Sequence, residues 1–174
     1  MSATDIAKNE KDPSLVAYLK SLGMDPDYVP PKDDPRRVVI SEFAVLFKTR
    51  DPVILKLSTE ADIAKAKSTP IPIKENEEFK MRVSFRVQHE PVLGLRIINT
   101  VSKLGKQVAS DEEMLGSYPP KNEFQALELP KNDWNEAPSG MLARGEYKSN
   151  VKFTDDDKQM YLQFDYLIKI VKEL

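Results

Sequence analysis

The sequence predicts an all-β protein: an immunoglobulin-like antiparallel β-sandwich with a short N-terminal helical regulatory arm. Two observations predict the sandwich, because segments of alternating apolar and polar residues recur along the chain and Pro- and Gly-rich stretches separate them. A third predicts the arm, since one amphipathic segment and a proline-rich stretch occupy the first 35 positions. The 174 residues suffice for one domain with an appendage, so we expect a flexible arm over 1–35 and a sandwich over 36–174.

The arm is predicted to contain one helix over about residues 13–22. Asp12 is a good N-cap, Pro13 suits the first helical position, and Gly23 suits the residue after the helix. The apolar side chains of this segment form one stripe at Leu15, Tyr18, Leu19 and Leu22. A helix this short is marginal alone, so its stripe must pack on the chain's own sandwich or on a partner protein. The Asp25–Pro35 linker, with four prolines, favours a partner.

The sandwich is predicted from runs in which every second residue is apolar. The clearest run has Phe79, Met81, Val83, Phe85 and Val87 on one face, and a second has Leu162, Phe164, Tyr166, Ile168 and Ile170. Further strands are expected at 38–47, 53–57, 95–101, 124–129 and 141–153. The segment 61–67 is helix-prone and is expected to form a surface turn of helix between strands.

Composition excludes several function classes. The 28 acidic and 26 basic residues nearly cancel, which is unlike a nucleic-acid-binding protein. There is no cysteine, the N-terminus has no signal-peptide pattern, and no run is long enough to span a membrane, so we expect a cytoplasmic protein without stable membrane insertion. With His89 as the single histidine and no nucleotide-binding motif, we expect no enzyme activity, no metal site and no cofactor.

Four segments, in this order, resemble the Rho GDP-dissociation inhibitor family: DPSLVAYLKSLG at 12–23, MRVSFRVQHEPVLGLR at 81–96, LGSYPP at 115–120 and APSGMLARGEYKSNVKFTDDDK at 137–158. The resemblance covers about residues 12 to 172. It implies a protein that binds a GDP-bound, geranylgeranylated Rho-family small GTPase one to one. Such a protein shields the isoprenoid lipid between its sheets, extracts the GTPase from membranes and slows GDP release by holding the switch regions.

The resemblance also assigns residues to a prenyl-binding pocket. The aligned positions are Val45, Ile71, Phe79, Leu142, Tyr166 and Ile168. Read from the sequence alone, each of these is also an ordinary core residue of a sandwich. Two aligned positions, Pro91 and Ser149, depart from the family's large apolar side chains, so the preferred prenyl length is left open.

The GTPase-binding residues implied by the resemblance are Asp12, Ser14, Leu15, Tyr18, Leu22, Glu136, Asp156 and Asp157. Asp12 also serves as a plain N-cap, and the Asp155–Asp157 run also fits a solvated turn. Only eleven residues precede Asp12, so we expect the family's first arm helix to be missing or weak.

Two alternatives of different function classes remain at this stage. One is a prenyl-binding carrier of other lipidated small GTPases, for which the helix at 12–23 would be unnecessary. The other is a β-sandwich protein-interaction module that binds no lipid.

Overall fold

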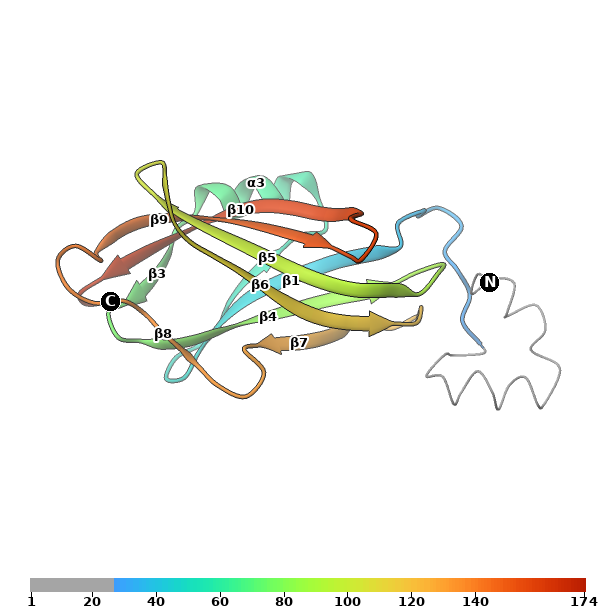
Figure 1. Cartoon of the computed structure of the whole chain (residues 1–174), viewed down its shortest axis with the longest axis horizontal. Helices are drawn as coiled ribbons and strands as arrows, with labels where there is room; N and C mark the ends of the chain where they lie inside the picture. The colour runs from blue at the N-terminus through green and yellow to red at the C-terminus, as the bar shows by residue number, and fades with distance from the viewer. Residues whose placement is uncertain (1–26) are drawn as a thin grey trace.

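The computed structural model describes residues 27–174 as two β-sheets packed face to face (Figure 1). The first sheet has the order β2–β1–β4–β7, and the short strand β8 also pairs with β4. Its strands are β1 (Val38–Phe47), β2 (Val53–Lys56), β4 (Glu78–Val87), β7 (Gln125–Leu129) and β8 (Asn135–Glu136). The second sheet has the order β3–β10–β9–β5–β6. Its strands are β3 (Ile71–Lys74), β5 (Val92–Lys103), β6 (Lys106–Tyr118), β9 (Gly145–Thr154) and β10 (Met160–Val171).

The core lies between the two sheets, where the alternating apolar residues meet. Val83, Phe85 and Val87 of β4 are fully buried, as period-two alternation predicts. Across the interface the ring of Phe43 lies 5.2 Å from that of Tyr166 and 5.6 Å from that of Phe164, between centroids. The prediction of an all-β sandwich is therefore confirmed.

Three strands have no counterpart in the sequence prediction, namely β3, β6 and β8. β3 contains Pro72 and runs parallel to β10, whereas the other pairings in the described part of the chain are antiparallel. The first seven residues of β6 are all exposed, so this edge strand shows no apolar alternation. The strand expected at 141–153 begins only at Gly145, because residues 141–143 form a turn.

The helix α3 (Glu60–Ser68) lies where the sequence predicts a turn of helix, and it packs over β10 (Figure 1). Thr59 and Asp62 form a capping box at its start, with hydrogen bonds of 3.1 and 3.2 Å. Among residues 27–174, no helix is long and apolar enough to cross a membrane.

The strands run lengthwise, so the sandwich has two distinct ends (Figure 1). At one end lie the segment that leads into β1, the β4–β5 turn and the β9–β10 turn. At the other end lie the C-terminus, β3 and the loop between β8 and β9. These two ends carry the two candidate sites.

Candidate functional site

An apolar pocket of about 440 Å³ opens at the end that holds the C-terminus. Both sheets and the loop between β8 and β9 contribute to it. Its lining residues are Ile73, Phe79, Val101, Lys103, Val108, Ala109, Pro138, Leu142, Tyr147, Ile168 and Ile170. A volume of this size lies within the range of roughly 300–1,000 Å³ typical of ligand pockets, and its lining suits an apolar ligand.

Residues 138–144, which we call the mouth loop, form one side of the pocket entrance. Glu75 accepts hydrogen bonds from the Gly140 amide at 2.9 Å and the Arg144 side chain at 2.8 Å. The Lys103 ammonium donates to the carbonyls of Leu142 and Arg144, both at 2.7 Å. Backbone and charge contacts therefore hold the loop, while the Leu142 side chain is 93% exposed.

The electrostatics of the mouth loop centre on Glu75. The hydrogen bond from Arg144 is the main cause that lowers the pKa of this carboxyl below its usual value, and the Gly140 amide adds to the effect. Gly140 itself has a φ of 99°, a conformation that side chains with a Cβ rarely adopt. The loop geometry thus depends on a charged carboxylate and on a glycine.

The structure places three of the six predicted pocket residues in the lining: Phe79, Leu142 and Ile168. Ile71 lies beside it, since it is buried and pairs in register with Ile168. Val45 and Tyr166 are fully buried between the sheets and do not line the pocket. For these two residues the structure gives a core position.

Several lining residues were not among the predicted pocket residues, and their positions explain why. Ile73 lies on β3, and Val108 and Ala109 lie on β6, two strands that the alternation pattern did not reveal. Ile170 continues the apolar face of β10, so the pattern could have found it. Glu136 of β8 is exposed and precedes Pro138 by two residues, which puts a carboxylate near the pocket entrance.

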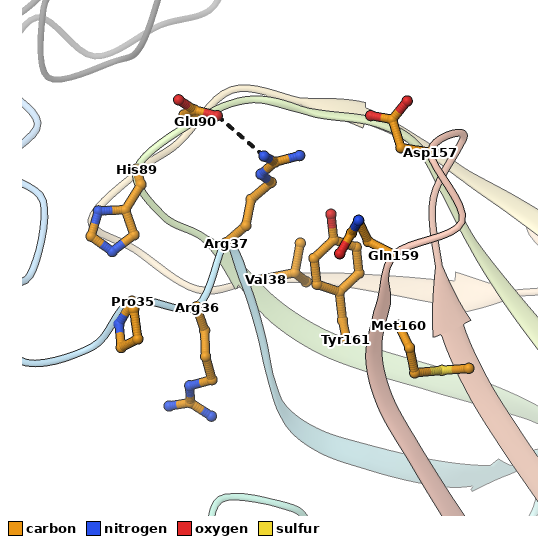
Figure 2. Close-up of a pocket in the computed structure, with 10 residues that line it drawn as sticks. All are labelled: Pro35, Arg36, Arg37, Val38, His89, Glu90, Asp157, Gln159, Met160 and Tyr161. Atoms are coloured by element: carbon orange, nitrogen blue, oxygen red, sulfur yellow. Dashed lines mark hydrogen bonds and ion pairs between the residues drawn. The ribbon is translucent and has the colours of Figure 1, made fainter.

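The opposite end carries a larger and more polar cavity of about 690 Å³ (Figure 2). We call this region the arm root; it comprises residues 28–37, the turn at 88–90 and the turn at 155–159. The cavity is lined by Pro35, Arg36, Arg37, Val38, His89, Glu90, Asp157, Gln159, Met160 and Tyr161. With this many charged groups, it is unsuited to a hydrocarbon chain.

Asp155 organises the β9–β10 turn at the arm root. Its buried carboxylate accepts the amides of Asp157 at 2.9 Å and Gln159 at 3.0 Å, and also the hydroxyl of Tyr161. The Arg37 nitrogen Nη1 lies 4.0 Å from the same carboxylate, and the other terminal nitrogen, Nη2, donates to Glu90 at 3.1 Å (Figure 2). Burial, followed by the Asp155 carboxylate, raises the pKa of Tyr161 to about 12. This first aspartate of the run therefore fixes the backbone of Asp157 and Gln159 in the turn.

The segment before β1 is fastened to the same end of the sandwich. The buried Gln88 donates its side-chain amide to the Arg36 carbonyl at 2.9 Å, and its backbone amide donates to the Arg37 carbonyl at 2.6 Å. The amide of His89 donates to the hydroxyl of Tyr28 at 2.8 Å, and the His89 ring nitrogen Nε2 lies 2.5 Å from the Asp34 carbonyl. Residues 28–37 thus follow the sandwich surface, although they form no helix or strand before Val38.

The predicted GTPase contacts Asp156 and Asp157 have different local environments. Asp156 forms an ion pair with Arg96 and its side chain covers Gly94, where any Cβ would collide with the carboxylate. Gly94 has a φ of 65°, a second reason for glycine there. Asp157 is exposed and lines the arm-root cavity. The predicted residues Asp12, Ser14, Leu15, Tyr18 and Leu22 lie outside the described residues.

Comparison with known proteins identifies relatives over almost the whole chain. The family model of the RHO protein GDP dissociation inhibitor matches residues 3–173. The Rho GDP-dissociation inhibitor of Schizosaccharomyces pombe is 39% identical over 163 residues, covering 93% of this chain and 78% of that protein. The Saccharomyces cerevisiae Rho GDP-dissociation inhibitor is 38% identical over 169 residues, covering 94% and 82% respectively. Rat Rho GDP-dissociation inhibitor 1 is 34% identical over 136 residues, covering 78% and 65%.

Proposed function

This chain belongs to the Rho GDP-dissociation inhibitor family, and we propose that it binds its GTPase through two separate ends of one sandwich. By this membership it is a GTPase regulator and not an enzyme. In the proposal, the apolar pocket takes the geranylgeranyl group of a GDP-bound Rho-family GTPase, and the arm root presents the arm and Asp156–Asp157 to the GTPase itself. One inhibitor binds one GTPase, and the complex stays in the cytoplasm.

The observation that carries the lipid half of the proposal is the apolar lining of the 440 Å³ pocket. A geranylgeranyl chain has about 20 carbons, and each buried CH₂ is worth roughly 0.8 kcal/mol, so burial can supply on the order of 10 kcal/mol. The pocket is open beside the mouth loop, where Leu142 exposes an apolar side chain that a lipid could contact.

Lipid burial alone does not account for extraction from a membrane. The bilayer interior offers the isoprenoid a similar transfer free energy, so the pocket only balances the membrane. A net surplus must come from protein–protein contacts, which the GTPase makes only with the inhibitor. The arm root supports this half of the proposal, because hydrogen bonds hold residues 28–37 at the same end of the sandwich as the exposed Asp157.

Glu136 fits a further contact in the same proposal. It is exposed on β8, near the pocket entrance where a prenylated C-terminus would leave the lipid site. A carboxylate there would attract a basic tail, and the attraction would fade as salt is added.

A liposome extraction assay tests the proposal. Vesicles are loaded with a geranylgeranylated Rho-family GTPase in its GDP form, and the same GTPase without its prenyl group is assayed in parallel for complex formation in solution. The proposal expects the chain to move the prenylated form into the soluble fraction and to slow GDP release from it. Extraction that fails for the prenylated form would overturn the lipid-shielding role.

A further inference from the structure

A layer of polar side chains lies directly behind the inner wall of the apolar pocket. Val101, Tyr147 and Ile168 line the pocket on three neighbouring strands, β5, β9 and β10. Two residues further from the entrance along each strand, on the same face, stand Asn99, Ser149 and Tyr166. Two residues further along the same three strands come the buried apolar residues Ile97, Val151 and Phe164, of which Val151 pairs in register with Asn99.

The three polar residues form a contiguous group, which we call the polar layer. Ser149 pairs in register with Tyr166 on one side and with Val101 on the other. Burial raises the pKa of the Tyr166 hydroxyl to about 12, and the nearby Ser149 and Asn99 side chains oppose that rise. Yet the Tyr166 hydroxyl, the Ser149 hydroxyl and the Asn99 side-chain oxygen are all buried without completing a hydrogen bond of normal geometry.

An apolar ligand cannot satisfy these atoms. Buried polar groups without partners are costly, and an isoprenoid chain has neither donors nor acceptors to offer them. An isoprenoid that lies against Val101 and Ile168 makes only apolar contacts. An isoprenoid that enters deeper must separate the two sheets at the polar layer. Its last carbons would then contact the hydroxyls of Ser149 and Tyr166 and the side-chain amide of Asn99.

We propose that the polar layer closes the inner end of the pocket and limits how deeply an isoprenoid enters. As a result, the chain binds a geranylgeranyl group only slightly more tightly than a farnesyl group. This inference rests on the proposed lipid-binding function and adds the chain length of the lipid that the pocket accepts. The two lipids differ by one isoprene unit, about five carbons. Complete burial of that extra unit against an apolar wall would strengthen binding by roughly a thousandfold.

The test measures binding of the full chain to two fluorescent peptides in solution, identical except for a farnesyl or a geranylgeranyl thioether on the terminal cysteine. The double variant Ser149→Ala with Tyr166→Phe removes two oxygens and adds no atoms beyond hydrogen, so it creates no overpacking. Thr100→Val is the matched control, because it removes a hydroxyl from the residue of β5 that follows Asn99. Thr100 lies on the opposite face of the strand, and its hydroxyl oxygen is 3.5 Å from that of Ser110.

We expect the wild-type chain to bind the geranylgeranyl peptide no more than about tenfold more tightly than the farnesyl peptide. In the double variant this ratio should rise by about tenfold or more, while Thr100→Val keeps the wild-type ratio. Thermal unfolding measured alongside should show a double variant at least as stable as wild type, because unpartnered buried hydroxyls are lost.

Two results would overturn the inference while leaving the proposed function standing. One is a wild-type ratio already near a thousandfold, and the other is a ratio that the double variant leaves unchanged although both peptides bind. If neither peptide binds the wild-type chain, the lipid-binding function itself is wrong, and the inference falls with it.

Discussion

The pocket end and the arm root of the sandwich are built from opposite kinds of contact. The pocket end is lined by apolar side chains and has a mouth loop held only at its backbone and at Glu75. The arm root is held together by hydrogen bonds of buried polar groups, of which Asp155 and Gln88 are the clearest examples. The apolar end suits a hydrocarbon ligand, whereas the hydrogen-bonded end holds residues 28–37 against the sandwich. One fold thus keeps the two kinds of site apart by placing them at opposite ends of its strands.

The largest effect is expected from Asp155→Ala, which removes the hydrogen-bond acceptor at the centre of the arm root. The change leaves two backbone amides and the Tyr161 hydroxyl without their buried acceptor. We expect the free energy of unfolding to fall by about 3 kcal/mol. Chemical denaturation measures it. Asp157→Ala is the control, since Asp157 is exposed and its removal should change stability by less than about 0.5 kcal/mol.

The next largest effect concerns lipid binding at the other end. Leu142→Asp places a charge in the pocket lining, yet the side chain is almost fully exposed in the free chain, so stability should hardly change. Affinity for a geranylgeranylated peptide should fall by about thirtyfold, because the carboxylate would be desolvated by the lipid. Met141→Asp is the matched control: its side chain is also exposed but does not line the pocket. Equal losses in both variants would argue that only surface charge matters.

A smaller effect is expected from the mouth loop. Glu75→Gln removes the charge that pairs with Arg144 while it keeps the shape of the side chain. The loop should then fluctuate more, and we expect prenyl-peptide dissociation to quicken by about two- to fivefold, which stopped-flow fluorescence can resolve. Because the pKa of Glu75 is lowered in the folded chain, the wild type should approach the variant's rate as the pH falls below the usual carboxyl range. A dissociation rate insensitive to both changes would mean that the loop does not gate the pocket.

The last effect appears only at alkaline pH and is shared by the two regions. Tyr161 at the arm root and Tyr166 in the polar layer both have a pKa raised to about 12, from an ordinary value of 10.0. A raised folded-state pKa gives stability that is complete below pH 10 and is lost as the pH rises toward 12. Unfolding curves at intervals from pH 8 to 12 should therefore shift to lower denaturant only above about pH 10. Tyr161→Phe should lessen that shift, and a shift that stays the same would contradict the assignment.

The sequence predicted the strands whose two faces differ in burial. β4 and β10 alternate clearly because one face is core and the other is not, and both were found. β3 and β6 were missed for physical reasons, since β3 is four residues long with a proline and β6 is an exposed edge. The mouth loop was mistaken for the start of a strand because Met141 and Leu142 are apolar, although both are exposed.

The candidate sites were predictable only in part. Alternation and the family resemblance together identified Phe79 and Ile168 of the pocket lining. Other parts of the pocket depend on contacts between residues far apart in the sequence. The hydrogen bonds from Lys103 to the mouth loop are an example, and local sequence patterns carry no information about them. The role of Asp155 was likewise hidden, because a run of three aspartates does not reveal which one is buried.

The most direct test of the two-ended account is an amide chemical-shift map of the chain, recorded first with a geranylgeranylated peptide alone and then with the complete prenylated GTPase. The account predicts that the peptide shifts amides around residues 73, 79, 101, 142 and 168 and leaves those at 88–90 and 155–159 unchanged. Only the complete GTPase should shift the second group. Peptide-induced shifts that centre on the arm root, or that are absent from the pocket end, would contradict the account.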